Sequence, residues 1–185
     1  MKIICFPYQS RHFYMRPDTA ILRNGHTFYT PEQSASIAGS LALVVKINRL
    51  GRHIAPQYAG RYYHETALGF CLYAADILEQ NRSKGVAWGE ACSFDYSSPL
   101  SSSFRSLIQH PVSGTVFSWR SEKQSWSETL PENPIDVVLS NLSQCIFLKM
   151  GDLIWIELHH PILISSGEEI YAYRNEIMEL NFSVQ

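Results

Sequence analysis

Several features that mark particular protein classes are missing from this sequence of 185 residues. Its longest apolar runs fall well short of the roughly 20 residues that a membrane-spanning helix needs. Lysine and arginine total 15 against 17 aspartates and glutamates, so no basic excess is present to neutralise nucleic-acid phosphates. The apolar segment at residues 1–7 is too short for a secretory signal peptide. We therefore expect a cytoplasmic protein that binds neither nucleic acid nor membranes.

The usual sequence patterns of zinc sites and serine nucleophiles are also missing. No Cys-x-x-Cys, His-x-His or His-x-x-x-His pattern occurs, and the one pair of adjacent histidines is His159-His160. Adjacent residues on a strand point to opposite faces, so we do not expect this pair to share a site. No Gly-x-Ser-x-Gly elbow is present. The cysteines are widely spaced, which predicts buried free thiols; they are Cys5, Cys71, Cys92 and Cys145.

The composition that remains is that of one globular domain spanning residues 1–185, with 45% hydrophobic and 17% charged residues. Its most informative segment is 40–47, in which six of eight residues are apolar and β-branched residues fill the second half. The sequence Asn-Arg-Leu-Gly follows at 48–51. This pattern predicts a buried strand that ends in a turn.

The other segments predict an α+β, β-rich fold with a few short helices. An Asn24-Gly25 pair between two apolar runs is a hairpin signal. Helices are expected at 55–60, at 74–84 before Gly85, and after Asn133-Pro134, where Asn133 caps and Pro134 takes the first helical position. Further strands are expected at 1–7, 66–73, 112–119, 124–129, 153–158, 170–173 and 177–184.

Several segments, taken in order, resemble the fumarylacetoacetate hydrolase (FAH) family over nearly the whole chain. They are residues 1–5, 16–22, 41–51, Trp88 with 93–100, and 148–154, which ends in Gly-Asp-Leu-Ile. The resemblance implies a mixed β-sandwich roll that forms a homodimer. It also implies Mg²⁺, Mn²⁺ or Ca²⁺ as cofactor. The implied activities are hydrolysis, decarboxylation or enol–keto isomerisation of 2-oxo acids such as acylpyruvates.

The residues that should carry this chemistry are replaced. The family holds its metal with two glutamates at alternate positions of the central strand and an aspartate from the next strand. These positions match Ser40, Ala42 and Cys71 here. A methyl group cannot coordinate a metal, a serine hydroxyl is a weak neutral ligand, and a thiol is too soft for Mg²⁺. We therefore expect no metal cofactor.

Other positions that carry the family's substrate-binding and catalytic residues are also replaced. The substrate-binding arginine falls at Ala75 and the lysine before Phe-Asp at Cys92, whereas Asp76 and Asp95 are kept. The Thr-Gly-Thr-Pro loop reads Ile-Glu-Leu-His at 156–159. The lid segment that carries the family's catalytic histidine is shortened to about 7–13, with His12 as a displaced remnant.

Each remaining candidate has a structural reading beside the functional one. Asp76 and Asp95 are weak catalytic candidates, and capping is the commoner role of such residues. Arg16, Tyr73 and Asp95 are candidates for binding a small carboxylate ligand. The alternative structural roles are bracing of a loop for Arg16 and core packing for Tyr73. For Cys71 and Cys92, inert burial is favoured over a reactive pair.

Two hypotheses follow. In the first, the protein keeps the FAH fold but is catalytically impaired or inactive, and acts as a ligand-binding or structural homologue. In the alternative, it remains a hydrolase, isomerase or decarboxylase of 2-oxo acids. That alternative requires a site rebuilt from Asp76, Asp95, Arg16 and His12, with Mg²⁺ or Mn²⁺ as cofactor. The first is preferred because enolate stabilisation in the family depends on the metal.

Overall fold

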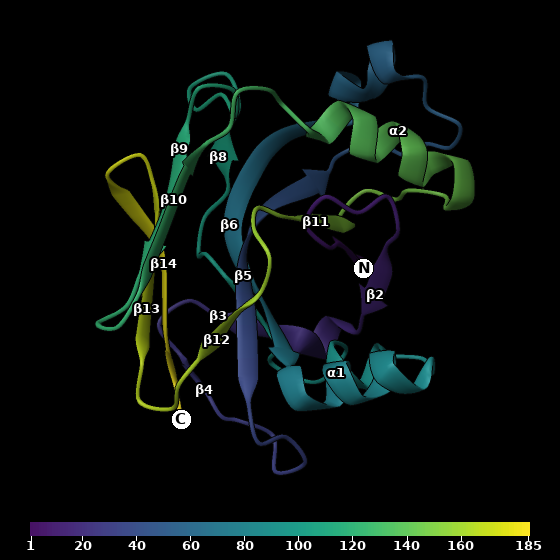
Figure 1. Ribbon diagram of the computed structural model, residues 1–185. Helices are drawn as coiled ribbons and strands as arrows, with labels where there is room; N and C mark the ends of the chain where they lie inside the picture. The colour runs from purple at the N-terminus through teal and green to yellow at the C-terminus, as the bar shows by residue number, and fades with distance from the viewer.

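The computed structural model describes residues 1–185 and places two β-sheets side by side (Figure 1). The larger sheet contains nine strands, seven of which run in the order β2 (Tyr14–Arg16), β1 (Ile3–Phe6), β11 (Leu153–Glu157), β5 (Ile37–Ile47), β6 (Tyr63–Ala74), β7 (Ser98–Leu100) and β3 (Ile21–Arg23). Two more strands pair with its central strands, β12 (Ile162–Ile164) with β5 and β8 (Arg105–Ser106) with β6. The second sheet has the order β10 (Ser125–Thr129), β9 (Val116–Arg120), β13 (Glu169–Arg174), β14 (Ile177–Val184) and β4 (Thr27–Phe28).

The predicted central strand is confirmed as β5, which is longer than the pattern indicated because it begins at Ile37. It pairs antiparallel with both β11 and β6, so it lies in the middle of the larger sheet. Leu41, Leu43 and Val45 point into the main core between the two sheets. Ala42 and Val44 point into a smaller core on the other face. Strand alternation therefore gives β5 two differently occupied faces.

The helices agree with the sequence signals. The helix α1 (Ala75–Lys84) ends at Gly85, whose φ of 64° is the left-handed conformation that glycine adopts without a Cβ penalty. The helix α2 (Ile135–Cys145) starts one residue later than expected, and the Asn133 side chain accepts the Ile135 N–H at 3.0 Å. Short 3₁₀ turns occupy Asp18–Ala20, Pro56–Arg61 and Gly89–Ala91. None of the helices combines the length and apolar character needed to cross a membrane.

The hairpin predicted around Asn24-Gly25 is wrong. The chain does turn there, with Gly25 at φ 80°, but the flanking strands belong to different sheets. β3 pairs in parallel with β7 in the larger sheet, and β4 pairs in parallel with β14 in the second. The Asn24 side chain accepts the Asn181 N–H at 2.7 Å, which fastens the turn to β14. Long-range pairing thus overrides a local turn signal.

The Gly-Asp-Leu-Ile segment joins the amino terminus to the sheet. Asp152 is 2% exposed and accepts the backbone N–H groups of Lys2 and Lys149 at 2.9 and 2.8 Å. Although burial alone raises the pKa of this carboxyl, these hydrogen bonds and the Lys2 ammonium hold it below its usual value. Asp152 therefore fixes the parallel pairing of β1 with β11.

Candidate functional site

The three positions that match the family's metal ligands come together in the fold. Ser40 and Ala42 lie on one face of β5, and Ser40 is the register partner of Cys71 on β6. Ser40 donates its hydroxyl to the His159 carbonyl at 2.6 Å. Ala42 and Cys71 have no exposed surface and belong to the smaller core. The three positions thus lie together as the family's metal ligands would, but their side chains carry no carboxylate.

These residues do not fit a hard divalent cation. A methyl group offers no donor, the Ser40 hydroxyl is already committed to a carbonyl, and burial raises the pKa of the Cys71 thiol well above its ordinary value. No three side chains of the His, Cys, Asp and Glu types are arranged to hold a metal ion. The chain's own donor set therefore supplies no site for Mg²⁺ or Mn²⁺.

Two large side chains of β11 occupy the same face of the sheet. Trp155 and Glu157 are the register partners of Val44 and Ala42. The Trp155 ring lies against Gly69 so closely that a Cβ added there would meet the indole at 2.2 Å. The indole fills the smaller core beside Cys5 and Cys71. Small residues on β5 and β6 thus leave space for the large side chains of Trp155 and Glu157 on β11.

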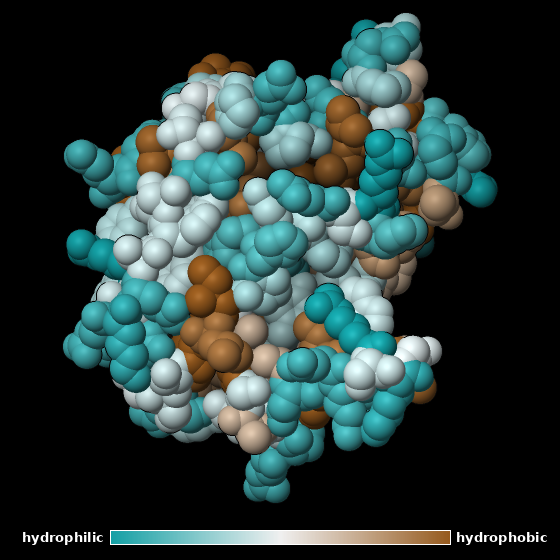
Figure 2. Space-filling view, viewed as in Figure 1, coloured by the Kyte–Doolittle hydropathy of each residue, from teal (hydrophilic) through white to brown (hydrophobic).

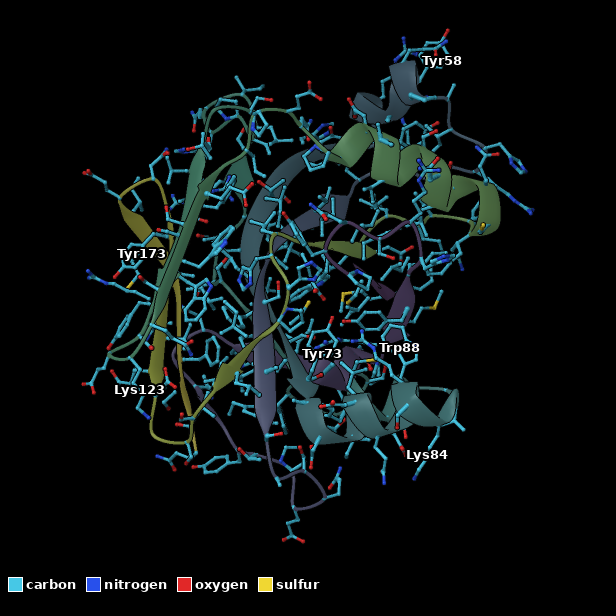
Figure 3. All side chains as sticks on the ribbon, in the orientation of Figure 1. Tyr58, Tyr73, Lys84, Trp88, Lys123 and Tyr173 are labelled. Carbon is cyan, nitrogen blue, oxygen red and sulfur yellow. The ribbon has the colours of Figure 1, made fainter.

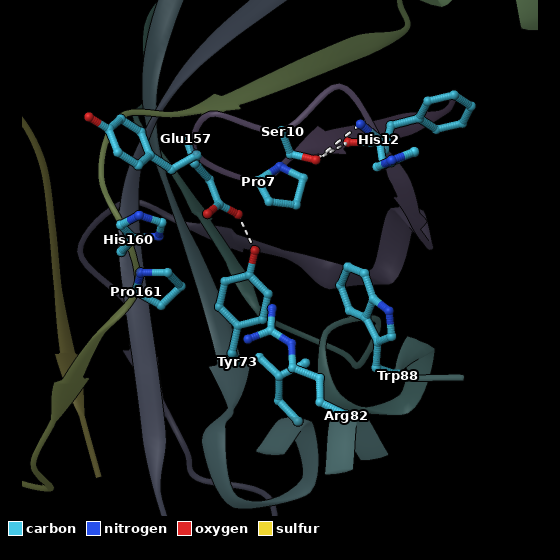
Figure 4. A pocket seen from close by; sticks show the side chains of 12 residues that line it. Pro7, Ser10, His12, Tyr73, Arg82, Trp88, Glu157, His160 and Pro161 are labelled. Carbon is cyan, nitrogen blue, oxygen red and sulfur yellow. Dashed lines mark hydrogen bonds between the residues drawn. The ribbon is translucent and has the colours of Figure 1, made fainter. Parts of the chain in front are cut away.

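Glu157 and Tyr73 meet over the central strand. β11 and β6 flank β5, and Tyr73 is the register partner of Ala38. The Tyr73 hydroxyl donates to Glu157 Oε1 (Figure 4). The side chains of β5 below this contact are small, namely Ala38, Ser40 and Ala42. This small-residue face is what lets two long side chains cross β5 and touch.

A chain of hydrogen bonds continues from this pair to a buried cation. The Tyr14 and Tyr73 hydroxyl oxygens lie 2.8 Å apart, and Arg16 Nη2 donates to the Tyr14 oxygen at 2.9 Å. Arg16 is only 4% exposed and also donates to the carbonyls of Ser97 and Leu72. Burial raises the pKa of both tyrosines well above the ordinary value, so their hydroxyls stay neutral donors. The result is an ordered path from Arg16 to Glu157.

Glu157 is the unusual ionisable group of the site. It is 3% exposed, and its Oε2 is buried. Burial raises its pKa to about 7, although the Tyr73 hydroxyl and the Arg16 charge oppose the shift. A carboxyl with such a pKa holds and releases a proton near neutral pH.

A cavity of about 560 Å³ opens above this pair. It lies between the 7–13 segment, the end of β6, α1 and the 157–161 segment (Figure 4). Its lining is Pro7, Tyr8, Ser10, His12, Phe13, Tyr73, Leu78, Arg82, Trp88, Glu157, His160 and Pro161. In Figure 3 the labelled Tyr73 and Trp88 lie together above α1, whereas Lys84 points away into solvent. Figure 2 shows an apolar patch over β12. The exposed Leu163 of β12 lines a neighbouring hollow that shares Arg82, His160 and Pro161 with the cavity.

The rim of the cavity can attract an anion. Arg82 lines it without forming any ion pair, and its guanidinium lies 5.8 Å from the centre of the Trp88 ring. His12 and His160 line it as well and are exposed. A guanidinium offers two parallel donors to a carboxylate. The cavity therefore combines a cationic rim with a buried carboxyl at its floor.

No family model matches the chain, but comparisons with individual proteins are informative. Mouse mitochondrial oxaloacetate tautomerase FAHD1 is 26% identical over 180 residues, which cover 93% of this chain and 80% of that protein. Fumarylpyruvate hydrolase from Pseudomonas aeruginosa, solved with Mn²⁺ and pyruvate, superposes with a TM-score of 0.86 at 20% identity, covering 100% of this chain and 89% of that one. A Yersinia pestis protein described as a putative FAH-family protein superposes with a TM-score of 0.87 at 18% sequence identity. The superposition covers 100% of this chain and 92% of that one. The chain therefore has the fold of these FAH-type proteins and is similar in sequence to FAHD1 over most of its length.

Two of the residues predicted from the sequence line the cavity of this FAH-family fold. His12 comes from the 7–13 segment and Tyr73 from the end of β6. Arg16 lies behind Tyr73, with its guanidinium 5.3 Å from the Tyr73 ring centre, and does not line the cavity. Arg16 thus positions Tyr14 and Tyr73 instead of facing a ligand directly.

The other predicted residues lie elsewhere. Asp76 accepts the Ser34 hydroxyl at 2.7 Å and the Ala35 N–H at 2.8 Å at the start of α1. Asp95 accepts the Thr19 hydroxyl at 2.5 Å. Cys92 is buried with its Sγ 3.5 Å from the Trp88 carbonyl. Cys92 belongs to the smaller core together with Cys71 and Tyr73, whereas neither Asp76 nor Asp95 lines the cavity.

Three residues that line the cavity were not predicted from the sequence: Glu157, Arg82 and Trp88. Glu157 stands where the family has the glycine of its Thr-Gly-Thr-Pro loop, in an otherwise apolar strand. An acid at a buried strand position is a recognisable signal, because burial of a lone carboxylate is costly. Arg82 gave no such signal, since an arginine on an exposed helix is ordinary.

Proposed function

We propose that this protein binds a small organic acid of the 2-oxo acid class in the Tyr73–Glu157 cavity without a metal ion. The observation that carries the proposal is the Arg82 guanidinium at the rim of this cavity. The positions that match the family's metal ligands hold Ser40, Ala42 and Cys71, which supply no carboxylate. A cavity of about 560 Å³ suits a small ligand. The FAH-family relatives support the ligand class, since the P. aeruginosa hydrolase was solved with pyruvate.

Arg82 is the residue expected to hold the ligand carboxylate. Its guanidinium lies 5.8 Å from the centre of the Trp88 ring and forms no ion pair with an acidic side chain. The two imidazoles, His12 and His160, add donors on the other sides of the cavity. The apolar wall formed by Phe13, Leu78 and Pro161 accommodates a short carbon chain.

Calorimetry with pyruvate and 2-oxobutanoate, in buffer that contains EDTA, tests the proposal. Arg82→Gln should weaken binding by about tenfold or more, because a charge-assisted bidentate contact is lost. Lys84→Gln is the matched control, since this exposed cation sits on the same helix and does not line the cavity. Absence of binding in the unmodified protein, or equal losses in both variants, would contradict the proposal.

The alternative, an enzyme rebuilt around Asp76, Asp95, Arg16 and His12, has less support from the geometry. Among these four residues, only His12 lines the cavity. Asp76 and Asp95 are engaged with Ser34 and Thr19 at loop contacts.

A further inference from the structure

A second hollow adjoins the cavity on the side of β12. Its volume is about 770 Å³, and four residues line both spaces, namely Leu78, Arg82, His160 and Pro161. The proposed function uses the cavity, where Arg82 holds a carboxylate beside a short carbon chain. It gives the second hollow no role.

The second hollow and the cavity share one face of the larger sheet. Ala38 on β5 is the register partner of Tyr73 on β6 and of Leu163 on β12. Register partners on neighbouring antiparallel strands point to the same face of a sheet. Tyr73, Ala38 and Leu163 therefore form one row across three strands, with a methyl group between two large side chains. We call the depression in this row, lined by Ala38, Leu163 and α1, the Ala38 groove.

The Ala38 groove has apolar walls. The helix α1 contributes Ala75 and Leu78, and the segment leading through β12 contributes Pro161 and Leu163. Leu163 is 63% exposed and belongs to neither core, although β12 carries the apolar patch seen in Figure 2. An alkyl chain lying in the groove would remove this apolar surface from water, which is favourable.

The charges around the groove favour a ligand with a single carboxylate. Apart from Arg82, the one residue with a formal charge that lines the second hollow is Glu79. A second carboxylate at the far end of a ligand would meet no guanidinium or ammonium group there, and Glu79 would repel it. Oxaloacetate and fumarylpyruvate, which give two of the relatives their names, are dicarboxylates. The groove therefore suits a different ligand.

We propose that the site selects 2-oxo acids with one carboxylate and an unbranched apolar chain, and that this chain lies in the Ala38 groove against Leu163. Tyr73 and Leu163 are two strand spacings apart, roughly 10 Å, which a chain of about six carbons beyond the carbonyl can span. The inference rests on the proposed function, because the carboxylate must be held at Arg82.

Calorimetry with pyruvate, 2-oxobutanoate, 2-oxohexanoate and 2-oxooctanoate, in buffer that contains EDTA, tests the groove. Each added methylene should tighten binding by about two- to fourfold, because it leaves water for an apolar wall. The affinity for 2-oxooctanoate should therefore exceed that for pyruvate by at least about 30-fold. 2-Oxoadipate has the length of 2-oxohexanoate and a second carboxylate. It should bind at least about tenfold more weakly than 2-oxohexanoate, since that charge is desolvated without a partner.

Two variants change the groove in different ways. Leu163→Ser removes an exposed apolar wall, and Ala38→Leu fills the depression between Tyr73 and Leu163. Each should lower the ratio of the 2-oxooctanoate affinity to the pyruvate affinity by at least about fivefold. Ile177→Ser is the matched control and should keep the ratio. Ile177 is also an exposed apolar residue, but it lies on β14 in the second sheet and lines neither hollow.

The outcomes separate this inference from the proposed function. Binding of pyruvate without any gain from chain length overturns the groove and leaves the proposed function standing. A gain that survives in both variants, or tighter binding of 2-oxoadipate than of 2-oxohexanoate, also overturns the groove. Absence of binding for every acid in the series overturns the proposed function itself.

Sedimentation velocity checks the other possible occupant of the groove, a second copy of the chain. A dimer that dissociates in Leu163→Ser would show that the partner covers Leu163, and this result overturns the inference. A gain with chain length that is lost in both groove variants and kept in Ile177→Ser supports it.

Discussion

The Trp155 indole lies directly against the α-carbon of Gly69, on the face of the sheet where β5, β6 and β11 meet. A Cβ at Gly69 would lie 2.2 Å from one indole carbon and 2.7 Å from a Val44 methyl carbon. Both neighbours are fully buried and cannot easily move. Only glycine at this position leaves room for the indole that fills the smaller core.

Replacing Gly69 by alanine should therefore destabilise the protein by about 2–3 kcal/mol or more, because the indole must shift within a packed core. Chemical denaturation of the two proteins measures the difference. Gly89→Ala is the control, since a Cβ there meets nothing within 4 Å. Similar losses for the two variants would show that close packing on Trp155 is not the cause.

Replacing Glu157 by glutamine should stabilise the protein at pH 8. The carboxyl titrates at about 7 when folded and at about 4.5 when exposed, so rising pH between these values favours the unfolded chain. Glutamine keeps an acceptor for Tyr73 without the buried charge. The gain should be roughly 2–3 kcal/mol at pH 8 and should vanish near pH 4. Denaturation curves at both pH values measure this gain in stability. A gain that does not depend on pH would contradict a raised Glu157 pKa as its cause.

His159 should remain neutral at pH 6. Its Nε2 accepts two donors, the Leu41 N–H at 3.0 Å and the Trp119 indole N–H at 2.8 Å, so the proton must sit on Nδ1, which lies 2.7 Å from the His160 carbonyl. Burial lowers the pKa of this imidazole. ¹⁵N NMR should show the Nδ1–H tautomer.

The same group makes stability fall on acidification. Below about 6.5 the unfolded chain binds a proton that folded His159 does not, so the unfolded state gains as pH falls from 7 toward the lowered folded value. A His159 ring that protonates at pH 6.5 or above in the folded protein would exclude this account.

Restoring a carboxylate at Ala42 should fail to rebuild a metal site. The position is fully buried and is the register partner of Glu157, so Ala42→Glu places two acids side by side in the smaller core. We expect a loss of at least about 3 kcal/mol. Adding Glu157→Gln should recover about 1 kcal/mol of it by removing the repulsion. The measurements are denaturation with and without Mn²⁺. Rescue of Ala42→Glu by the metal alone would disprove the prediction.

Much of the fold could be read from local patterns because strand alternation, Gly85 and Asn133 act on their own neighbours. The β9–β10 pair and the antiparallel β13–β14 pair also follow from segments close in the chain. The turn at Asn24-Gly25 could not be read this way. Its flanking strands pair with β7 and β14, which are far away in the sequence.

For the site, the amino-acid sequence by itself determined which carboxylates are missing: Ser40, Ala42 and Cys71 are visible without any coordinates. Tertiary structure decided what replaced them. Glu157 and Tyr73 are 84 residues apart, and they meet because β11 and β6 flank β5 in a register that puts both over small side chains. Burial then moves the Glu157 pKa to about 7, and burial is a property of the assembled sheet alone.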